Sequence, residues 1–203
     1  MKPNSSYGNF QKYRSRNVVQ KALILRFLNM VSGLVGALPV ETLLDVGCAE
    51  GFVLQHILQY SGLHIFAQGV DIDREAIDRG RMLHPTLSFQ VANIYNLPFC
   101  DRSFDLVLCL QVLEHLDFPE QALIELVRVS RAFCLLGVPN EPFFRMANLL
   151  RGKNILRLGN DVEHLHNWSK GSFLRLVHPF LEILTARTSF PWLIVLGRKR
   201  NFT

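Results

Sequence analysis

Cysteine is scarce in this sequence, and its spacing gives no sign of a metal site or a disulfide framework. The 203 residues include four cysteines, and no two of them form a Cys-x-x-Cys pair. The four are Cys48, Cys100, Cys109 and Cys134, and the last two lie in apolar runs typical of buried strands. We therefore expect buried, reduced thiols and predict no bound metal.

Long uncharged apolar runs are also lacking. Lys21 and Arg26 interrupt the best candidate for a membrane span, residues 18–40, and we expect this to exclude a span. The first seventeen residues are polar and lack the apolar core of a secretory signal. The sequence therefore predicts a soluble, cytoplasmic protein.

Acidic residues are absent from the N-terminal end of the sequence, and there are few of them at the C-terminal end. Residues 1–26 carry six basic side chains and no acid, and residues 142–203 carry ten basic and three acidic ones. Residues 27–141 carry six basic and fourteen acidic side chains, although the whole chain has a net charge of +5. This distribution of charge predicts an acidic core module that lies between two basic accessory segments.

Short apolar runs alternate with helical patterns from residue 42 onward. We predict strands over 42–46, 65–70, 87–91, 104–110 and 132–138, and helices over 51–60, 74–83, 119–129 and 169–177. This alternation is typical of an α/β fold with a parallel sheet and helices on both faces. The last two apolar runs, 181–185 and 192–197, predict a closing antiparallel pair.

The apolar stretch 17–38 predicts a further helix with two interpretations. It covers one side of the core, or it is an amphipathic helix on a membrane surface. In the second case its basic side chains, together with those just before it, face anionic lipid; they are Lys12, Arg14, Arg16, Lys21 and Arg26. The sequence leaves both interpretations open.

The most informative segment is an apolar strand that ends in Asp45 and runs into a loop containing Gly47 and Gly51. Glycine lets a backbone approach a ligand closely, and the helix that follows offers free N–H groups to a carboxylate. Asp71 ends the next strand, where a carboxylate can accept both hydroxyls of a ribose. The acidic Glu50, between the two glycines, favours a ligand with a positive end over a pyrophosphate.

These motifs resemble those of class I S-adenosylmethionine-dependent methyltransferases, of the small-molecule, type 11-like kind. Residues 45–51 resemble the family's first motif, 69–73 its ribose-binding segment and 91–99 its adenine-contacting segment. Residues 104–116 are similar to its fourth strand and following turn, and 138–140 to the end of its fifth strand. Two departures are Ala49 in place of the middle glycine and Asn93 where family members commonly carry Asp.

The resemblance, which covers roughly residues 40–140, implies S-adenosylmethionine as cofactor and a single methyltransferase domain over 1–203. The implied fold is a doubly wound, mostly parallel, seven-stranded Rossmann-like sheet with an antiparallel last strand and helices on both faces. Within it, 1–40 form an arm and helix, 41–139 the cofactor core, 140–168 a substrate lid, and 169–203 a helix and strand pair.

The resemblance also implies which residues contact the cofactor. Gly47 and Gly51 approach the methionine part, Asp71 holds the ribose, and Asn93 bonds the adenine amino group. The full set is Tyr13, Asp45, Gly47, Cys48, Glu50, Gly51, Asp71, Ile72, Asn93, Ile94 and Gln111. Interpretations without a ligand stay open for these residues. The glycines would then serve only a tight turn, Asp71 would be a solvated acid at a strand end, and Asn93 would be an ordinary turn former.

The acceptor end is less defined. His164 and His166 precede the helix at 169–177 and are the candidate catalytic bases, with a structural role as the alternative. Aromatic and basic residues alternate over 140–154. This pattern has two interpretations: a solvated loop that packs two Phe side chains onto the core, or a lid for a small-molecule or lipid-like acceptor that is partly apolar and partly anionic.

Two other functions remain open. The basic flanks would also suit a nucleic-acid methyltransferase. Against this, the fourth strand ends in Cys109-Leu110-Gln111-Val112, without the Asn/Asp-Pro-Pro-aromatic motif of base-amino methylation. A catalytically inactive, cofactor-binding partner protein is the second alternative, and the sequence assigns no oligomeric state.

Overall fold

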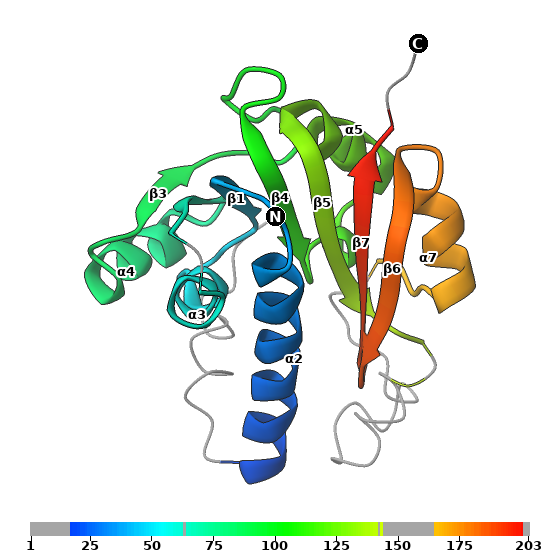
Figure 1. The fold of residues 1–203 in the computed structure, drawn as a ribbon, viewed down its shortest axis with the longest axis horizontal. Coiled ribbons are helices and arrows are strands. Elements are labelled where there is room, and N and C mark those ends of the chain that lie inside the picture. Colours follow the sequence, from blue (N-terminus) through cyan, green and yellow to red (C-terminus); the bar gives the residue numbers. More distant parts are fainter. Residues whose placement is uncertain (1–16, 63, 142, 144–164, 201–203) are drawn as a thin grey trace.

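One seven-stranded sheet with helices on both faces organises the chain in a computed structural model, which describes residues 17–62, 64–141, 143 and 165–200 (Figure 1). The strands are β1 (Thr42–Val46), β2 (Phe66–Asp71), β3 (Ser88–Val91), β4 (Phe104–Leu110), β5 (Ser130–Pro139), β6 (Leu181–Ser189) and β7 (Trp192–Lys199). The helices are α2 (Val18–Gly36), α3 (Phe52–Tyr60), α4 (Arg74–Leu83), α5 (Pro119–Val129), α7 (Lys170–Val177) and the short 3₁₀ turn η1 (Leu113–His115).

The strand order is β3-β2-β1-β4-β5-β7-β6. Neighbours from β3 to β5 pair in parallel, whereas β7 is antiparallel to both β5 and β6. The central strands β1, β4 and β5 are almost entirely buried because helices cover both faces, which explains their continuous apolar runs. The predicted doubly wound sheet with an antiparallel last strand is confirmed.

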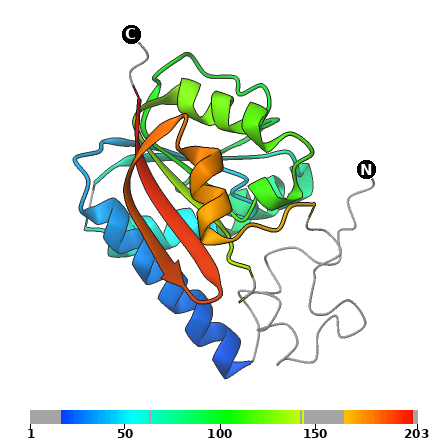
Figure 2. The ribbon, with the colours of Figure 1, turned by 90° about the vertical axis from the view of Figure 1, so that its right-hand side faces the viewer.

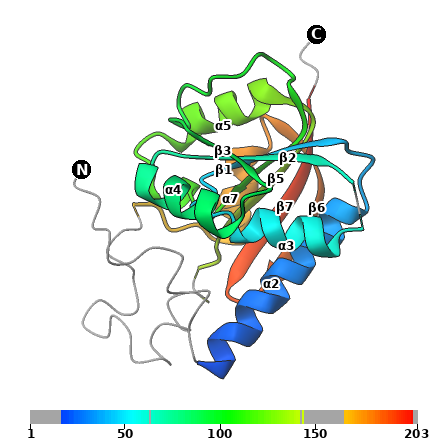
Figure 3. The same ribbon diagram turned by 90° about the vertical axis from the view of Figure 1, so that its left-hand side faces the viewer.

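Two hydrophobic clusters lie on opposite faces of the sheet. Side chains of α2, α3 and α4, such as Val35, Ile57 and Ile77, pack on one face. Side chains of α5 and α7, such as Leu123 and Phe173, pack on the other. Figure 2 shows α5 and α7 together, and Figure 3 shows α2 beside α3. This double cover leaves the loops at the strand ends free to form a site.

Helix α2 covers the core with its second half, as the first interpretation predicts, and leaves its first half largely exposed. Its second half is buried, and Phe27 packs edge-on against Trp192 with ring centroids 5.2 Å apart. Its first half is largely exposed, with Val18 and Val19 at 78% and 64% relative exposure.

The expectation that Lys21 and Arg26 exclude a membrane span is too strict. By length and composition α2 is long and apolar enough to cross a bilayer, with a mean hydropathy of 1.5, because a span tolerates two charges. A third of that stretch is buried inside the protein, and one such helix near the N-terminus is weak support for a span.

Two smaller expectations need correction. Cys100 is exposed, in the loop after β3, so only three of the four free cysteines are buried. Strand β6 continues to Ser189, beyond the predicted end at 185, because its pairing with β7 extends to Trp192. A polar strand end at the sheet edge has no apolar pattern that marks it in the sequence.

Candidate functional site

The site forms where β1, β2 and β4 end side by side. Asp45 lies level with Gly69 of β2 and Leu108 of β4 in the parallel register. Because parallel strands point the same way, the residues that follow them gather at one edge of the sheet. The loop 47–51, the end of β2 and Gln111 after β4 therefore come together.

The loop after β1 is fastened to the end of β2 through main-chain groups. The Val70 carbonyl accepts from the N–H groups of Gly47 (2.8 Å) and Cys48 (3.0 Å). The carboxylate of Asp71 accepts from the Ala49 N–H at 2.8 Å and from the Asp73 N–H at 2.9 Å. Burial raises the pKa of Asp71, and these backbone hydrogen bonds offset that rise only in part. The Asp71 carboxylate is thus held in one orientation at the site.

Gly47 and Gly51 are required by the fold, because neither the backbone angles nor the space around them suits a side chain. Gly47 and Gly51 both have left-handed backbones, with φ of 80° and 82°. A Cβ atom on Gly47 would lie 2.2 Å from Cγ2 of Val112, and one on Gly51 would lie 2.5 Å from the Phe89 ring. Close packing against Val112, just before η1, and Phe89 of β3 therefore explains these glycines, and it accounts for them without any ligand.

Asp45 is a buried acid at the centre of the site. Its side chain is in the core at 2% exposure, and its Oδ2 has no hydrogen-bond partner among the described residues. Burial, and then the nearby charge of Asp71, raises the pKa of Asp45 to about 7. An acid in this state is poised to ionise when a cation arrives.

Gln111 carries a second unsatisfied buried group. Its backbone is left-handed at φ 61°, and its N–H donates to the Gly137 carbonyl at 2.7 Å. Its side-chain Nε2 is buried and has no hydrogen-bond partner within the described part of the chain. Ala49 shares the left-handed backbone, at φ 46°. Strained backbone beside unsatisfied polar atoms is typical of ligand sites.

Two of the predicted cofactor residues face inward. Cys48 is buried against Gly69, and burial raises the pKa of its thiol far above the usual range. Glu50 is 1% exposed, and its Oε1 accepts from Arg79 Nε (3.2 Å) and NH2 (3.0 Å). Arg79 thus neutralises the negative charge of Glu50 that was expected to face a cationic ligand, and Asp45 is better placed for that role.

The segment expected to contact adenine, residues 91–99, lies beside the site, and Arg128 of α5 holds its end by hydrogen bonds. Asn93 is exposed, and its Oδ1 accepts from the Tyr95 N–H at 3.0 Å, so it does form a turn, as the interpretation without a ligand predicts. Ile72 is 72% exposed, whereas Ile94 packs partly against the core. The guanidinium of Arg128 donates to the carbonyls of Leu97 (3.0 Å) and Phe99 (2.8 Å) and pairs with Glu125 and Asp101.

His166 lies near η1. Its Nε2 donates to the Leu116 carbonyl at 3.0 Å, and its ring stacks on Trp168 with centroids 5.2 Å apart. This bond places the proton on Nε2 and leaves Nδ1 as the basic nitrogen of the neutral ring. His164 and Tyr13, and most of the predicted lid, lie outside the described residues.

Sequence reasoning missed three residues that shape the site: Val112, Arg79 and Arg128. Each acts on a partner far away in the chain, such as Arg79 on Glu50 at a separation of 29 residues. The signal that was available is chemical: a buried acid in a glycine loop favours a nearby cation, and Arg79 lies on α4, the helix after β2.

Gly47→Ala is expected to lower the free energy of unfolding by about 2–4 kcal/mol, because the new Cβ meets Val112 in a left-handed backbone. Gly62→Ala is the matched control, since Gly62 has φ 73° but no atom within 4 Å of a Cβ. It should cost only about 1 kcal/mol. Urea denaturation measures both, and equal losses would contradict the packing role of Gly47.

Comparisons with known proteins agree with this site. The family model described as a methyltransferase domain matches residues 44–133. Norajmaline N-methyltransferase of Rauvolfia serpentina is 30% identical over 96 residues, covering 44% of this chain and 32% of that enzyme. Ubiquinone biosynthesis O-methyltransferase, mitochondrial, of Candida albicans is 29% identical over 127 residues, covering 58% and 38%. The chain thus spans less than half the length of these relatives.

The fold is shared with solved methyltransferases. The structure of magnesium protoporphyrin IX methyltransferase from Synechocystis PCC 6803, with bound SAH, superposes with a TM-score of 0.70 at 17% identity. The superposition covers 95% of this chain and 94% of that one. Residues 44–133 therefore match a methyltransferase domain, and the described fold is that of solved methyltransferases, one of which holds SAH.

Proposed function

We propose that this chain is an S-adenosylmethionine-dependent methyltransferase that acts on a small-molecule or lipid-like acceptor. The observation that carries the proposal is the pair of carboxylates at the ends of β1 and β2. Asp45 is buried with an unpartnered oxygen, and Asp71 is fixed by two backbone N–H groups. This donor set fits a ligand that is cationic at one end and carries a ribose at the other.

The residues present fit the cofactor in distinct ways. Asp45 would balance the positive charge of its methionine part, and Asp71 would accept its ribose hydroxyls. Ile72, which is 72% exposed beside Asp71, offers an apolar surface for the adenine, and Asn93 lies on the neighbouring turn. The buried Nε2 of Gln111 supplies a polar group on the β4 side.

Little protein chemistry is required for this reaction. When bound, the cofactor supplies an activated methyl group on a sulfonium that leaves as a neutral thioether. The chain has to hold the acceptor in line and exclude water, and such positioning supplies up to roughly 7–11 kcal/mol. The absence of a reactive nucleophile among the described site residues is therefore compatible with catalysis.

The acceptor is proposed to lie beside η1 and His166. With Nε2 bonded to the Leu116 carbonyl, the Nδ1 atom of His166 is available to take a proton from a hydroxyl acceptor. The named relatives methylate nitrogen in one case and oxygen in the other, and both names refer to small molecules. We therefore propose the class of acceptor and assign no methylated atom.

Calorimetry with S-adenosylmethionine and with NAD tests the cofactor. We expect binding of S-adenosylmethionine alone. Asp71→Asn should weaken it by about 10–100-fold, because a charged hydrogen-bond acceptor contributes about 1.5–3 kcal/mol. Asp78→Asn is the control, since Asp78 is exposed and pairs with Arg81 on the same helix. NAD binding without S-adenosylmethionine binding would contradict the proposal.

The affinity for S-adenosylmethionine should depend on pH through Asp45. Its pKa is raised to about 7 in the free protein, and a bound cation requires the ionised form. Affinity should therefore increase up to about tenfold per pH unit between about pH 5.5 and 7, and then level off. Asp45→Asn should bind more weakly and without this slope. A slope that persists in Asp45→Asn would assign the titration to another group.

His164 and His166 are tested as bases by separate replacement with Ala. Transfer of labelled methyl groups from S-adenosylmethionine to acceptors in cell extract gives the rates. Loss of a general base should lower kcat by about 10²–10⁴-fold in one variant with little change in KM. His64→Ala is the control, because His64 is exposed near the start of β2. Unchanged kcat in both variants would refute a base at either position.

A further inference from the structure

The first half of α2 carries an apolar stripe that the fold does not use. Val18, Ala22 and Leu25 are spaced at i, i+4 and i+7, so they lie above one another on a helix. All three are exposed, Val18 at 78% and Leu25 at 52%. The buried side chains of the helix, including Val31 and Val35, lie on the opposite side.

Basic side chains border this stripe on both sides. At about 100° per residue, Lys21 lies on one flank of the Val18–Leu25 line and Arg26 on the other. Both are exposed, and α2 contains no acidic residue. The charge distribution of the sequence agrees, since residues 1–26 carry six basic side chains and no acid. The surface is thus apolar along its centre and cationic at its borders.

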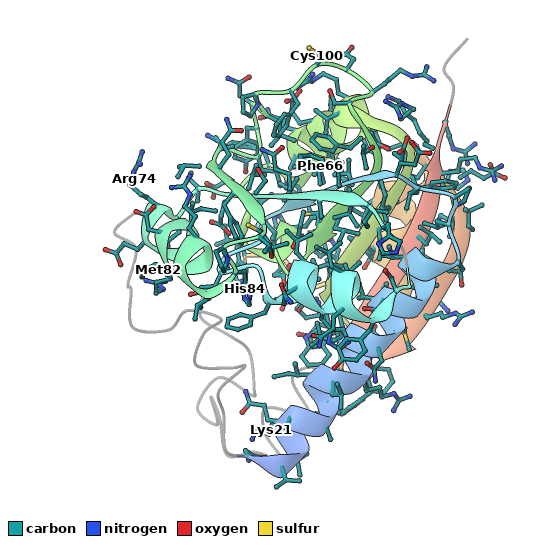
Figure 4. All side chains as sticks on the ribbon, turned by 60° about the vertical axis from the view of Figure 1, so that its left-hand side comes forward. Lys21, Phe66, Arg74, Met82, His84 and Cys100 are labelled. Atoms are coloured by element: carbon teal, nitrogen blue, oxygen red, sulfur yellow. The ribbon has the colours of Figure 1, made fainter. Side chains whose placement is uncertain are left out.

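The stripe projects beyond the body of the protein on the side of the candidate site. Phe27 is the first fully packed side chain of the helix, where it meets Trp192. The nine residues before it extend about 13 Å farther at 1.5 Å per residue. Figure 1 shows this half of α2 pointing toward the side where β4 and β5 end, and Figure 4 shows Lys21 near its tip.

We propose that this half of α2 docks on an anionic lipid bilayer, lying in the plane of the interface. Val18, Ala22 and Leu25 enter the boundary between headgroups and acyl chains, while Lys21 and Arg26 reach the lipid phosphates. A transmembrane arrangement would pull Phe27, Val31 and Val35 out of the core, whereas interfacial docking leaves them packed.

Charge complementarity favours a lipid surface over other occupants. A second copy of the helix would bring Lys21 and Arg26 against the same cations with no acid to pair them. A nucleic acid would match the cations but would leave the apolar stripe against phosphates. An anionic bilayer offers both an apolar layer for the stripe and negative charge for Lys21 and Arg26.

Co-sedimentation of the full chain with vesicles tests the proposal. We compare pure phosphatidylcholine with phosphatidylcholine containing about 30% phosphatidylserine. Binding is expected to the second vesicle, with loss at about 0.5 M salt, where the charges are screened. Leu25→Glu, and separately Lys21→Glu with Arg26→Glu, should each lower the partition coefficient at least about tenfold.

Matched variants separate this surface from a general effect. Ile124→Glu places the same charge at an apolar side chain of α5 that is 54% exposed, against 52% for Leu25. Lys170→Glu with Arg175→Glu makes the same change in net charge on α7. Both controls should bind vesicles as the unaltered protein does.

All variants are first shown to bind S-adenosylmethionine normally, which keeps this test separate from that of the proposed function. Equal binding to both vesicles, unchanged binding by Leu25→Glu, or equal loss in the controls would overturn the proposal. So would a dimer in solution that Leu25→Glu dissociates, because it would assign the stripe to a second copy.

Discussion

The site depends on how the loop after β1 is tied to the end of β2. One carbonyl, of Val70, receives two N–H groups of this loop, and one carboxylate, of Asp71, receives a third. The loop can follow this path only because Gly47 has a left-handed backbone and no Cβ to meet Val112. Once the loop is held there, the Asp45 carboxylate, the Asp71 carboxylate and Gln111 occupy one edge of the sheet.

Charge pairing explains which acids of the middle region are available to a ligand. Glu50, Glu125 and Asp101 are each bonded to an arginine, so their charge is balanced within the protein. Asp45 and Asp71 have no such partner in the described part of the chain, and burial raises the pKa of both. At the edge of the sheet where β1 and β2 end, Asp45 and Asp71 are therefore the two acids best placed to respond to a cationic ligand. We propose Asp45 for the role first expected of Glu50, because Arg79 reaches Glu50 from α4.

The two halves of helix α2 lie in different environments, one in the core and one at the surface. Its second half belongs to the core, where Val31 and Val35 are fully buried. Its first half is less covered by the described residues, and its exposed side chains are apolar or basic. The exposed half extends on the same side as the strand ends that carry the site. A lipid-like acceptor and an interfacial helix would then lie on one side of the molecule, although neither proposal requires the other.

The sequence by itself determined the order of the elements, the strand-end acids and the family resemblance. These rest on local patterns: apolar runs for β1, β4 and β5, glycines in the loop 47–51, and Asp71 directly after its strand. Only the tertiary structure decided what each motif residue does. Val112 leaves no room for a Cβ atom on Gly47, and Arg79 pairs with Glu50. Arg128 donates hydrogen bonds to the loop at 97–101, and all three partners come from distant parts of the chain. Such pairings depend on how strands and helices pack, and no local pattern encodes the distance between two side chains that meet only after folding.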